Sequence, residues 1–174
     1  RDGFRVDRDP GVPEEIRVIG KNGQRRSHVA PWAIYRRHDW IQKYVLDEMD
    51  RSIAQGNYEG LWANWEPQTL LSEWDYSEQT RREFINHSKL PAEEVEQLWL
   101  DDLVKKHRDK WDAFRNWELG QCAKLYSETI HNAGKKFGRD AWFTMCAPQD
   151  NYLIYDSFKG ASFQMLSGGD LPAV

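Results

Sequence analysis

Two short apolar runs joined by a long amphipathic stretch constrain this chain more than any other feature. The runs span residues 58–63 and 141–146, and each is long enough for one strand. Between them, residues 113–136 carry apolar side chains at helical spacing. A strand that reaches the next strand through a helix forms a βαβ unit, in which the strands are parallel and helices cover the sheet. The sequence therefore predicts an α/β fold.

The N-terminal part of the chain carries one hairpin signal and one helix signal. Asn22-Gly23 lies between strand-like runs and predicts a β-hairpin over 16–29, because the tightest turns need positive φ at both central residues. Asp39 is a favoured N-cap residue, and apolar residues at 3.6-residue spacing follow it up to Gly56. A helix is therefore predicted from Asp39 to Gly56.

The remaining segments define the domain organisation. Helices are predicted over residues 78–87 and after Pro91, so helices are inserted between the first strand and the long helix. Proline and glycine punctuate residues 1–15, which predicts a linker or loop. Residues 16–150 are predicted to form one α/β domain. The periodicity fades over residues 151–174, which predicts an irregular C-terminal segment.

The charge balance and the cysteine content argue against several kinds of partner and site. The net charge is −4 and the 24 basic residues are scattered, whereas a nucleic-acid surface needs a basic face. No apolar run approaches the length of a membrane-spanning helix, so neither nucleic acid nor a membrane is expected as a partner. Cys122 and Cys146 make neither a disulfide framework nor a zinc spacing, and both are expected to be buried. The sequence is compatible with a secreted, a periplasmic or a cytoplasmic protein.

The histidine and glycine patterns point to no metal and no cofactor. The five histidines form no His-x-His or His-x-x-x-His pair, so metal-dependent hydrolysis has little support. The sequence also contains no Gly-x-Ser-x-Gly elbow, no phosphate loop and no dinucleotide fingerprint. The sequence therefore gives little support to acyl transfer, nucleotide hydrolysis or hydride transfer.

Polar groups follow both predicted strands, at the edge where α/β folds place their sites. A carboxyl group next to an indole is partly desolvated, which raises its pKa as a general acid near neutral pH requires. Glu66 stands in this setting and is the leading catalytic candidate; the alternative is that it only caps a segment or pairs with an arginine. In an extended strand Asn64 and Glu66 point to one face, so the amide can orient a substrate hydroxyl. The polar residues after the two strands are Asn64, Glu66, Asp150 and Asn151.

The chain is rich in tryptophan, with nine in 174 residues. Tryptophan supplies a large apolar surface and one N–H donor, so proteins use it in cores and as a stacking platform for sugars. Most of the tryptophans are expected in the core. The aromatic residues placed to stack on a sugar lie before the first helix or around the first strand end: Trp32, Tyr35, Trp62, Trp65 and Trp74. The tryptophans expected in the core are Trp40, Trp99, Trp111, Trp117 and Trp142.

A strand followed by Asn-Trp-Glu-Pro and a long loop resembles the fourth strand of clan-A glycoside hydrolases, where Asn-Glu, often Asn-Glu-Pro, ends that strand. Residues 111–146 resemble the next helix and the fifth strand of β-galactosidase-like members. The resemblance covers about residues 28–150 and implies part of a (β/α)8 TIM-type barrel, with residues 16–150 as a partial barrel catalytic domain. It also implies that Glu66 is the acid/base of a retaining mechanism. In this chain a tryptophan stands between the asparagine and the glutamate.

The resemblance leaves the second catalytic group outside these residues. A retaining glycosidase needs a second carboxylate about 5–5.5 Å from the first, and in the resembling families it comes from the seventh strand. A complete barrel takes at least ~200 residues, so the chain is expected to be a piece of a larger barrel. The expected partners are a carbohydrate substrate and either the rest of the barrel or a second copy. The alternative function is a carbohydrate-binding or interaction domain without catalysis. The expected substrate-binding residues are Asn64, Trp65, Trp62, Trp32, Tyr35, Asp150 and Asn151.

Overall fold

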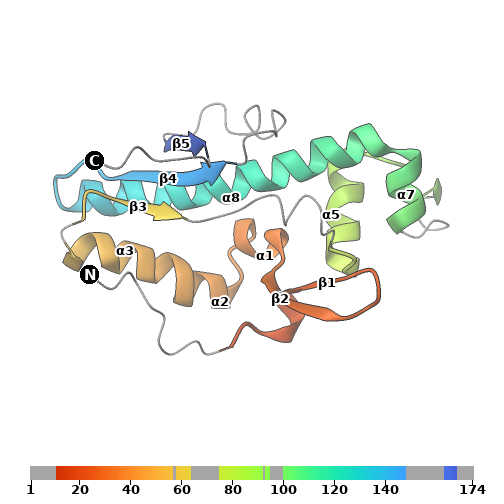
Figure 1. Ribbon diagram of the computed structural model, residues 1–174, viewed down its shortest axis with the longest axis horizontal. Coiled ribbons are helices and arrows are strands. Elements are labelled where there is room, and N and C mark those ends of the chain that lie inside the picture. Colours follow the sequence, from red (N-terminus) through yellow and green to blue (C-terminus); the bar gives the residue numbers. More distant parts are fainter. Residues whose placement is uncertain are drawn as a thin grey trace.

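The computed structural model describes residues 11–56, 58–63, 75–91, 93–94, 100–147 and 163–167. These residues form a mixed α/β structure, with a parallel sheet, helices and a separate hairpin (Figure 1). The predicted fold class is therefore confirmed as α/β, and no closed barrel is present in the described part of the chain. The parallel sheet has the order β3 (Gly60–Ala63), β4 (Trp142–Ala147) and β5 (Phe163–Ser167).

A long helix connects the first two of these parallel strands, as the sequence predicts. Helix α8 (Arg108–Lys136) leads from the insertion back to β4, and β4 pairs with β3 from Gly60↔Trp142 to Ala63↔Met145. The third strand, β5, pairs with β4 in parallel from Phe143↔Phe163 onwards. This strand was not predicted, and it lies within residues 151–174, which were expected to be irregular.

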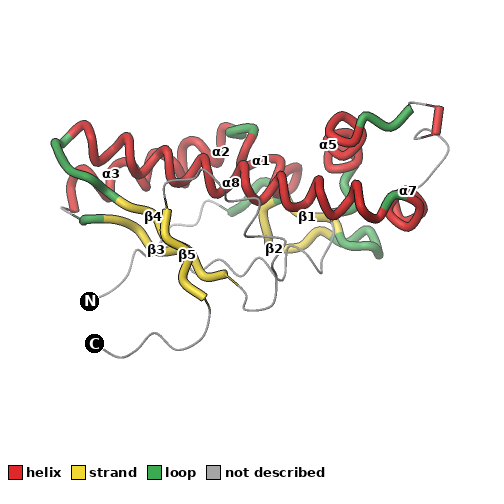
Figure 2. The backbone as a smooth tube through the Cα atoms, turned by 90° about the horizontal axis from the view of Figure 1, so that it is seen from above, coloured by secondary structure: helices red, strands yellow, loops and turns green. Residues whose placement is uncertain are grey.

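Helices α3 (Asp47–Gly56) and α8 cover the same face of this sheet (Figure 2). Apolar side chains from both helices meet side chains from the strands in one buried cluster. Burial of this apolar surface stabilises the arrangement by roughly 25 cal/mol per Å². The fully buried members from α3, α8 and β4 include Ile53, Leu119, Ala123, Ile130 and Phe143.

The predicted helix from Asp39 to Gly56 is present as three consecutive elements, α2 (Asp39–Ile41), a π-helical turn (Gln42–Leu46) and α3. Its N-cap is His38, not the predicted Asp39. The Nδ1 atom of His38 accepts a hydrogen bond from the backbone N–H of Trp40 at 3.3 Å. Asp39 lies instead in the first turn, where a carboxylate favours the helix macrodipole.

The predicted hairpin is also confirmed, although its turn is of another type. Strands β1 (Arg17–Ile19) and β2 (Arg25–Val29) are antiparallel. In the turn only Gly23 has positive φ, and its N–H donates to the carbonyl oxygen of Gly20 at 2.9 Å. A turn with two positive φ values is therefore absent. The hairpin is flanked by a 3-10 turn (Glu14–Ile16) and by the short helix α1 (Pro31–Tyr35).

The insertion between β3 and the long helix is helical, as predicted. Helices α5 (Glu78–Ser88) and α7 (Leu100–Lys106) pack on the N-terminal half of α8. Their shared core contains Phe84, Leu103, Val104, Trp111 and Phe114.

The predicted burial of the cysteines and tryptophans is confirmed in part. Trp111 and Cys122 are buried, but Trp142 is 46 % exposed, so its assignment to the core is wrong. Trp142 is the first residue of β4, and because side chains alternate along a strand, its indole lies on the face opposite to Phe143, which packs against α3 and α8. Trp99 and the side chain of Cys146 lie outside the described residues.

A Gly60→Ala substitution is expected to destabilise the protein by about 1–3 kcal/mol. A Cβ at Gly60 would overlap the carbonyl oxygen and the indole ring of Trp142, and the backbone oxygen is fixed by the sheet. Gly56→Ala is the matched control, because the three atoms nearest to a Cβ there all belong to the exposed ring of Tyr58 and none to the backbone. Urea unfolding of both variants checks the prediction, and equal midpoints would contradict it.

Candidate functional site

The carboxyl ends of β3 and β4 lie side by side at one edge of the sheet. Strand β3 ends at Ala63, which pairs with Met145, and β4 ends two residues later at Ala147. Glu66 follows the end of β3 by three residues, and Asp150 follows the end of β4 by three. Both of these residues lie outside the described part of the chain, together with Asn64, Trp65, Trp74 and Asn151. The structure thus places the two strand ends together without placing these side chains.

The remaining predicted site residues lie in β3 and α1. Trp62 pairs through its backbone register with Thr144 in β4, and its side chain is outside the described part. Trp32 and Tyr35 belong to α1 and are half-buried. The indole Nε1 of Trp32 is buried and has no hydrogen-bond partner among the described residues.

Tyr35 is held by two neighbours from α8. Its ring contacts the ring of Trp117 edge to face, with centroids 5.2 Å apart. Its hydroxyl donates to Oε1 of Glu118 at 3.3 Å. Burial and the charge of Glu118 raise the pKa of Tyr35 well above its ordinary value, so the phenol stays neutral. The hydroxyl of Tyr35 is therefore engaged by a protein carboxyl group, which sequence reasoning did not foresee.

Glu118 lies at the same level along α8 as the carboxyl edge of the sheet. The rings of Tyr126 in α8 and Phe143 in β4 are in contact, and the helix runs antiparallel to the strand (Figure 1). Glu118 precedes Tyr126 by eight residues, which is about 12 Å along a helix. Ala147 follows Phe143 by four residues, which is about 13 Å along a strand. Measured along the axis of α8, the carboxyl group of Glu118 therefore lies at about the same height as the carboxyl end of β4.

Glu118 is completely buried beside a buried arginine. Nη1 of Arg115 donates to Oε2 of Glu118 at 2.5 Å, and the two side chains are 2 % and 0 % exposed. Burial raises the pKa of Glu118 to about 7. The positive charge of Arg115 opposes this rise, and the negative charge of Asp75 adds to it. Because Glu118 does not reach solvent, it cannot act on a substrate directly.

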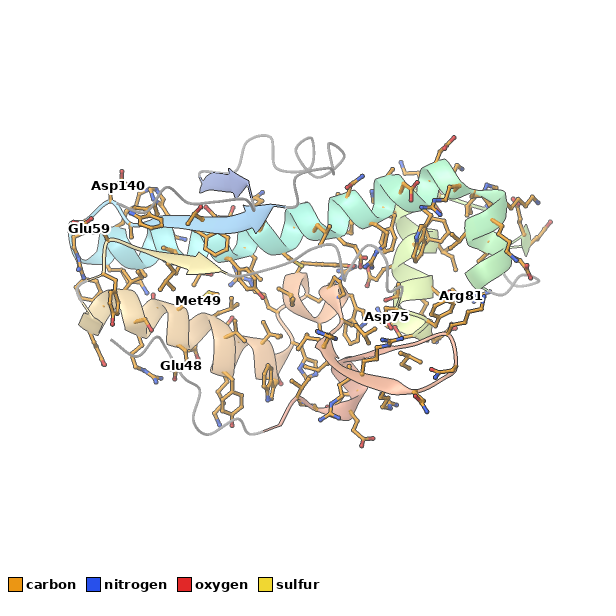
Figure 3. All side chains as sticks on the ribbon, viewed as in Figure 1. Glu48, Met49, Glu59, Asp75, Arg81 and Asp140 are labelled. Carbon is orange, nitrogen blue, oxygen red and sulfur yellow. The ribbon has the colours of Figure 1, made fainter. Side chains whose placement is uncertain are left out.

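Asp75 is a second completely buried carboxyl group, placed where the hairpin meets α5 (Figure 3). Its Oδ1 accepts the backbone N–H groups of Ile19 at 2.9 Å and Ser77 at 3.0 Å. Its Oδ2 accepts the hydroxyls of Ser77 at 2.7 Å and Thr80 at 2.5 Å. Ser77 in turn caps α5 by accepting the N–H of Thr80 at 3.2 Å. Asp75 therefore ties the hairpin to the start of α5.

An ion pair ties α1 to α5. The Nη2 atom of Arg36 lies 2.8 Å from Oε2 of Glu83, and its Nε donates to Oε1 at 3.2 Å. Glu83 is 5 % exposed, whereas the guanidinium of Arg36 is largely exposed. A near-buried carboxylate with a bidentate partner is well satisfied. We refer to Asp75, Glu83, Arg115 and Glu118 as the buried charge cluster.

The buried charge cluster was not predicted from the sequence, although α8 carries one signal of it. Arg115 and Glu118 are three residues apart and lie among residues with a large apolar surface. Charged residues are almost never fully buried unless they are paired. Charged residues in a predicted helix are therefore expected to be exposed to solvent. The neighbouring buried residues on α8 are Trp111, Phe114, Leu119 and Cys122.

Comparisons with known proteins assign the chain to no family. No protein-family model matches the chain, and no match is found among curated proteins or among solved structures. Within the described ranges, no group of three His, Cys, Asp or Glu side chains could hold a metal ion. None of the helices in those ranges is both long and apolar enough to cross a membrane.

Proposed function

We propose that the protein hydrolyses O-glycosidic bonds with a retaining mechanism in which Glu66 is the acid/base. The observation that carries this proposal is the parallel pairing of β3 with β4. It brings the two strand ends that precede Glu66 and Asp150 to one edge of the sheet, which is where α/β enzymes hold their catalytic groups. The Asn-Trp-Glu-Pro sequence then supplies a carboxyl group, an amide and an indole at that edge.

The topology is that expected for an arc of a barrel. Strands β3, β4 and β5 lie in the order of the sequence without a reversal. Helix α3 before β3 and helix α8 after it cover the same face of the sheet. A (β/α)8 barrel has both features, and one half of a doubly wound sheet has them as well. The resemblance of the Asn-Trp-Glu-Pro sequence to the barrel glycosidases favours the barrel, and we take the sheet as an arc of one, with the α5–α7 insertion after β3.

In the proposed mechanism Glu66 first donates its proton to the glycosidic oxygen, while a second carboxylate attacks the anomeric carbon. The bond to the leaving group breaks, and a covalent glycosyl-enzyme forms. The ionised Glu66 then takes a proton from the water that hydrolyses this intermediate. Asn64, Asp150 and Asn151 hydrogen-bond the sugar hydroxyls, and the indoles near the strand end cover its apolar face.

The stereochemistry of hydrolysis tests the proposal. The protein expressed from its complete gene is incubated with a panel of p-nitrophenyl glycosides, and the first-formed sugar is followed by proton NMR. We expect one glycoside to be cleaved with retention at the anomeric carbon, and methanol to trap the intermediate as a methyl glycoside of the same configuration. An inverted product excludes the retaining mechanism. Glycan binding without hydrolysis of any glycoside would identify the protein as a carbohydrate-binding domain.

A further inference from the structure

The junction between α1, α5 and α8 buries more negative than positive charge. Asp75 and Glu118 are completely buried and Glu83 nearly so, while Arg115 is the buried cation among the described residues of this junction. Glu83 is already neutralised by Arg36. Among the described residues, the two buried carboxyl groups Asp75 and Glu118 are thus accompanied by one buried guanidinium, which bonds to Glu118.

The other titratable groups that the structure describes at this junction do not supply a further positive charge. The hydroxyl of Tyr35 and the thiol of Cys122 both have a pKa raised by burial, so they stay neutral. His87 of α5 contacts Trp117, and burial lowers the pKa of its imidazole, so it carries little charge near pH 7. A proton on Glu118 is thus the available means of removing the excess negative charge.

The contacts of Glu118 and Asp75 join four separate elements. Glu118 bonds to Tyr35 of α1, and Asp75 bonds to β1 of the hairpin and to the first turn of α5. We refer to α1, the hairpin and α5 as the outer layer: α1 and α5 pack on α8, and Asp75 joins the hairpin to α5 (Figure 3). Among the described residues, Arg115 is the one buried cation beside Glu118 and Asp75, so ionisation of both carboxyl groups leaves one of the two buried negative charges uncompensated by these residues and weakens the packing of the layer.

We propose that Glu118 is a pH-dependent switch that controls how firmly the outer layer is held on α8. With a proton on Glu118, the layer is held by the Tyr35 contact and by the Asp75 hydrogen bonds. When Glu118 ionises, its charge repels that of Asp75, and the layer opens locally more often. The proposal does not depend on glycosidase activity.

The direction of the pH effect follows from proton linkage. The pKa of Glu118 lies near 7 in the folded protein and at its ordinary value of 4.5 when the residue is exposed to water. Between these values the folded state binds the extra proton, so stability falls as the pH rises. The stabilisation by Glu118 is fully present below pH 4.5 and is lost as the pH passes through about 7.

Amide hydrogen exchange measured by mass spectrometry between pH 5.5 and 8, corrected for intrinsic rates, tests the switch. We expect protection of the amides of Ile19 and Thr80 to fall by about tenfold or more over this range. Amides of α3 are expected to keep constant protection, because they pack on the other half of α8. Glu118→Gln is expected to remove the pH dependence, because an amide of the same shape does not titrate.

Two further variants sharpen the result. Glu128→Gln is the matched control: it changes an exposed glutamate of the same helix, and the wild-type pH dependence is expected to persist. Tyr35→Phe removes a hydrogen bond that lowers the pKa of Glu118, so the midpoint of the change is expected at higher pH. The proposal is overturned by wild-type protection that does not vary with pH, by an equal loss in α3, or by an unchanged midpoint in Tyr35→Phe.

Discussion

Glu66→Gln is expected to lower the turnover of a glycoside with a poor leaving group by about 10²–10⁴-fold, with little change in substrate binding. Glutamine has the shape and polarity of glutamate but no proton to donate at neutral pH. The loss is expected in kcat, because the proton is transferred only in the transition state. Steady-state kinetics with alkyl glycosides and with 2,4-dinitrophenyl glycosides measure it. The latter need no protonation of the leaving group, so their glycosylation step is expected to be nearly normal.

The acid and base roles of Glu66 can be separated from a structural role by added azide. In Glu66→Ala, azide attacks the glycosyl-enzyme without a general base, so it is expected to restore turnover and give a glycosyl azide of retained configuration. Glu59→Gln is the matched control, because Glu59 is an exposed glutamate just before the opposite end of β3 (Figure 3). Wild-type turnover in Glu66→Gln would show that the catalytic carboxyl group lies elsewhere.

The local periodicity of the sequence was sufficient to predict the α/β core. A short continuous apolar run predicts a strand that is buried on both faces. Apolar residues at 3.6-residue spacing predict a helix that is buried on one face. The start of α8 was predicted five residues too late, because its first turn, Arg108–Lys110, is polar and has no apolar stripe. Strand β5 was missed because its five residues include Gln164 and Ser167, which leave too short an apolar run to predict a strand.

The buried charge cluster could not be predicted from local sequence, because its burial depends on contacts between distant segments. Tyr35 and Glu118 are 83 residues apart, and Ile19 and Asp75 are 56 apart. A charged residue on a helix is normally solvated, so only the packing of α1 and α5 on α8 reveals that this one is not. For the proposed active site, the sequence predicted two strand ends at one edge, and the structure confirms that β3 and β4 are neighbours.

Asp75→Ala is expected to reduce the free energy of unfolding by about 3–5 kcal/mol. The substitution leaves the buried N–H groups of Ile19 and Ser77 without an acceptor, and each costs about 1–3 kcal/mol. It also removes the acceptor of the Ser77 and Thr80 hydroxyls, which weakens the start of α5. The loss of repulsion with Glu118 offsets part of this cost. Urea unfolding followed by tryptophan fluorescence measures the change.

Asp75→Asn separates the hydrogen-bonding role of this residue from its charge. Both backbone N–H groups bond to Oδ1, which asparagine keeps, and the amide nitrogen can donate to the two hydroxyls instead. The asparagine variant is therefore expected to lose less than half as much stability as the alanine variant. Asp102→Ala, on the exposed side of α7, is the control and is expected to change stability by no more than about 0.5 kcal/mol. If the alanine and asparagine variants were equally unstable, the negative charge of Asp75, rather than its hydrogen bonds, would hold the hairpin to α5.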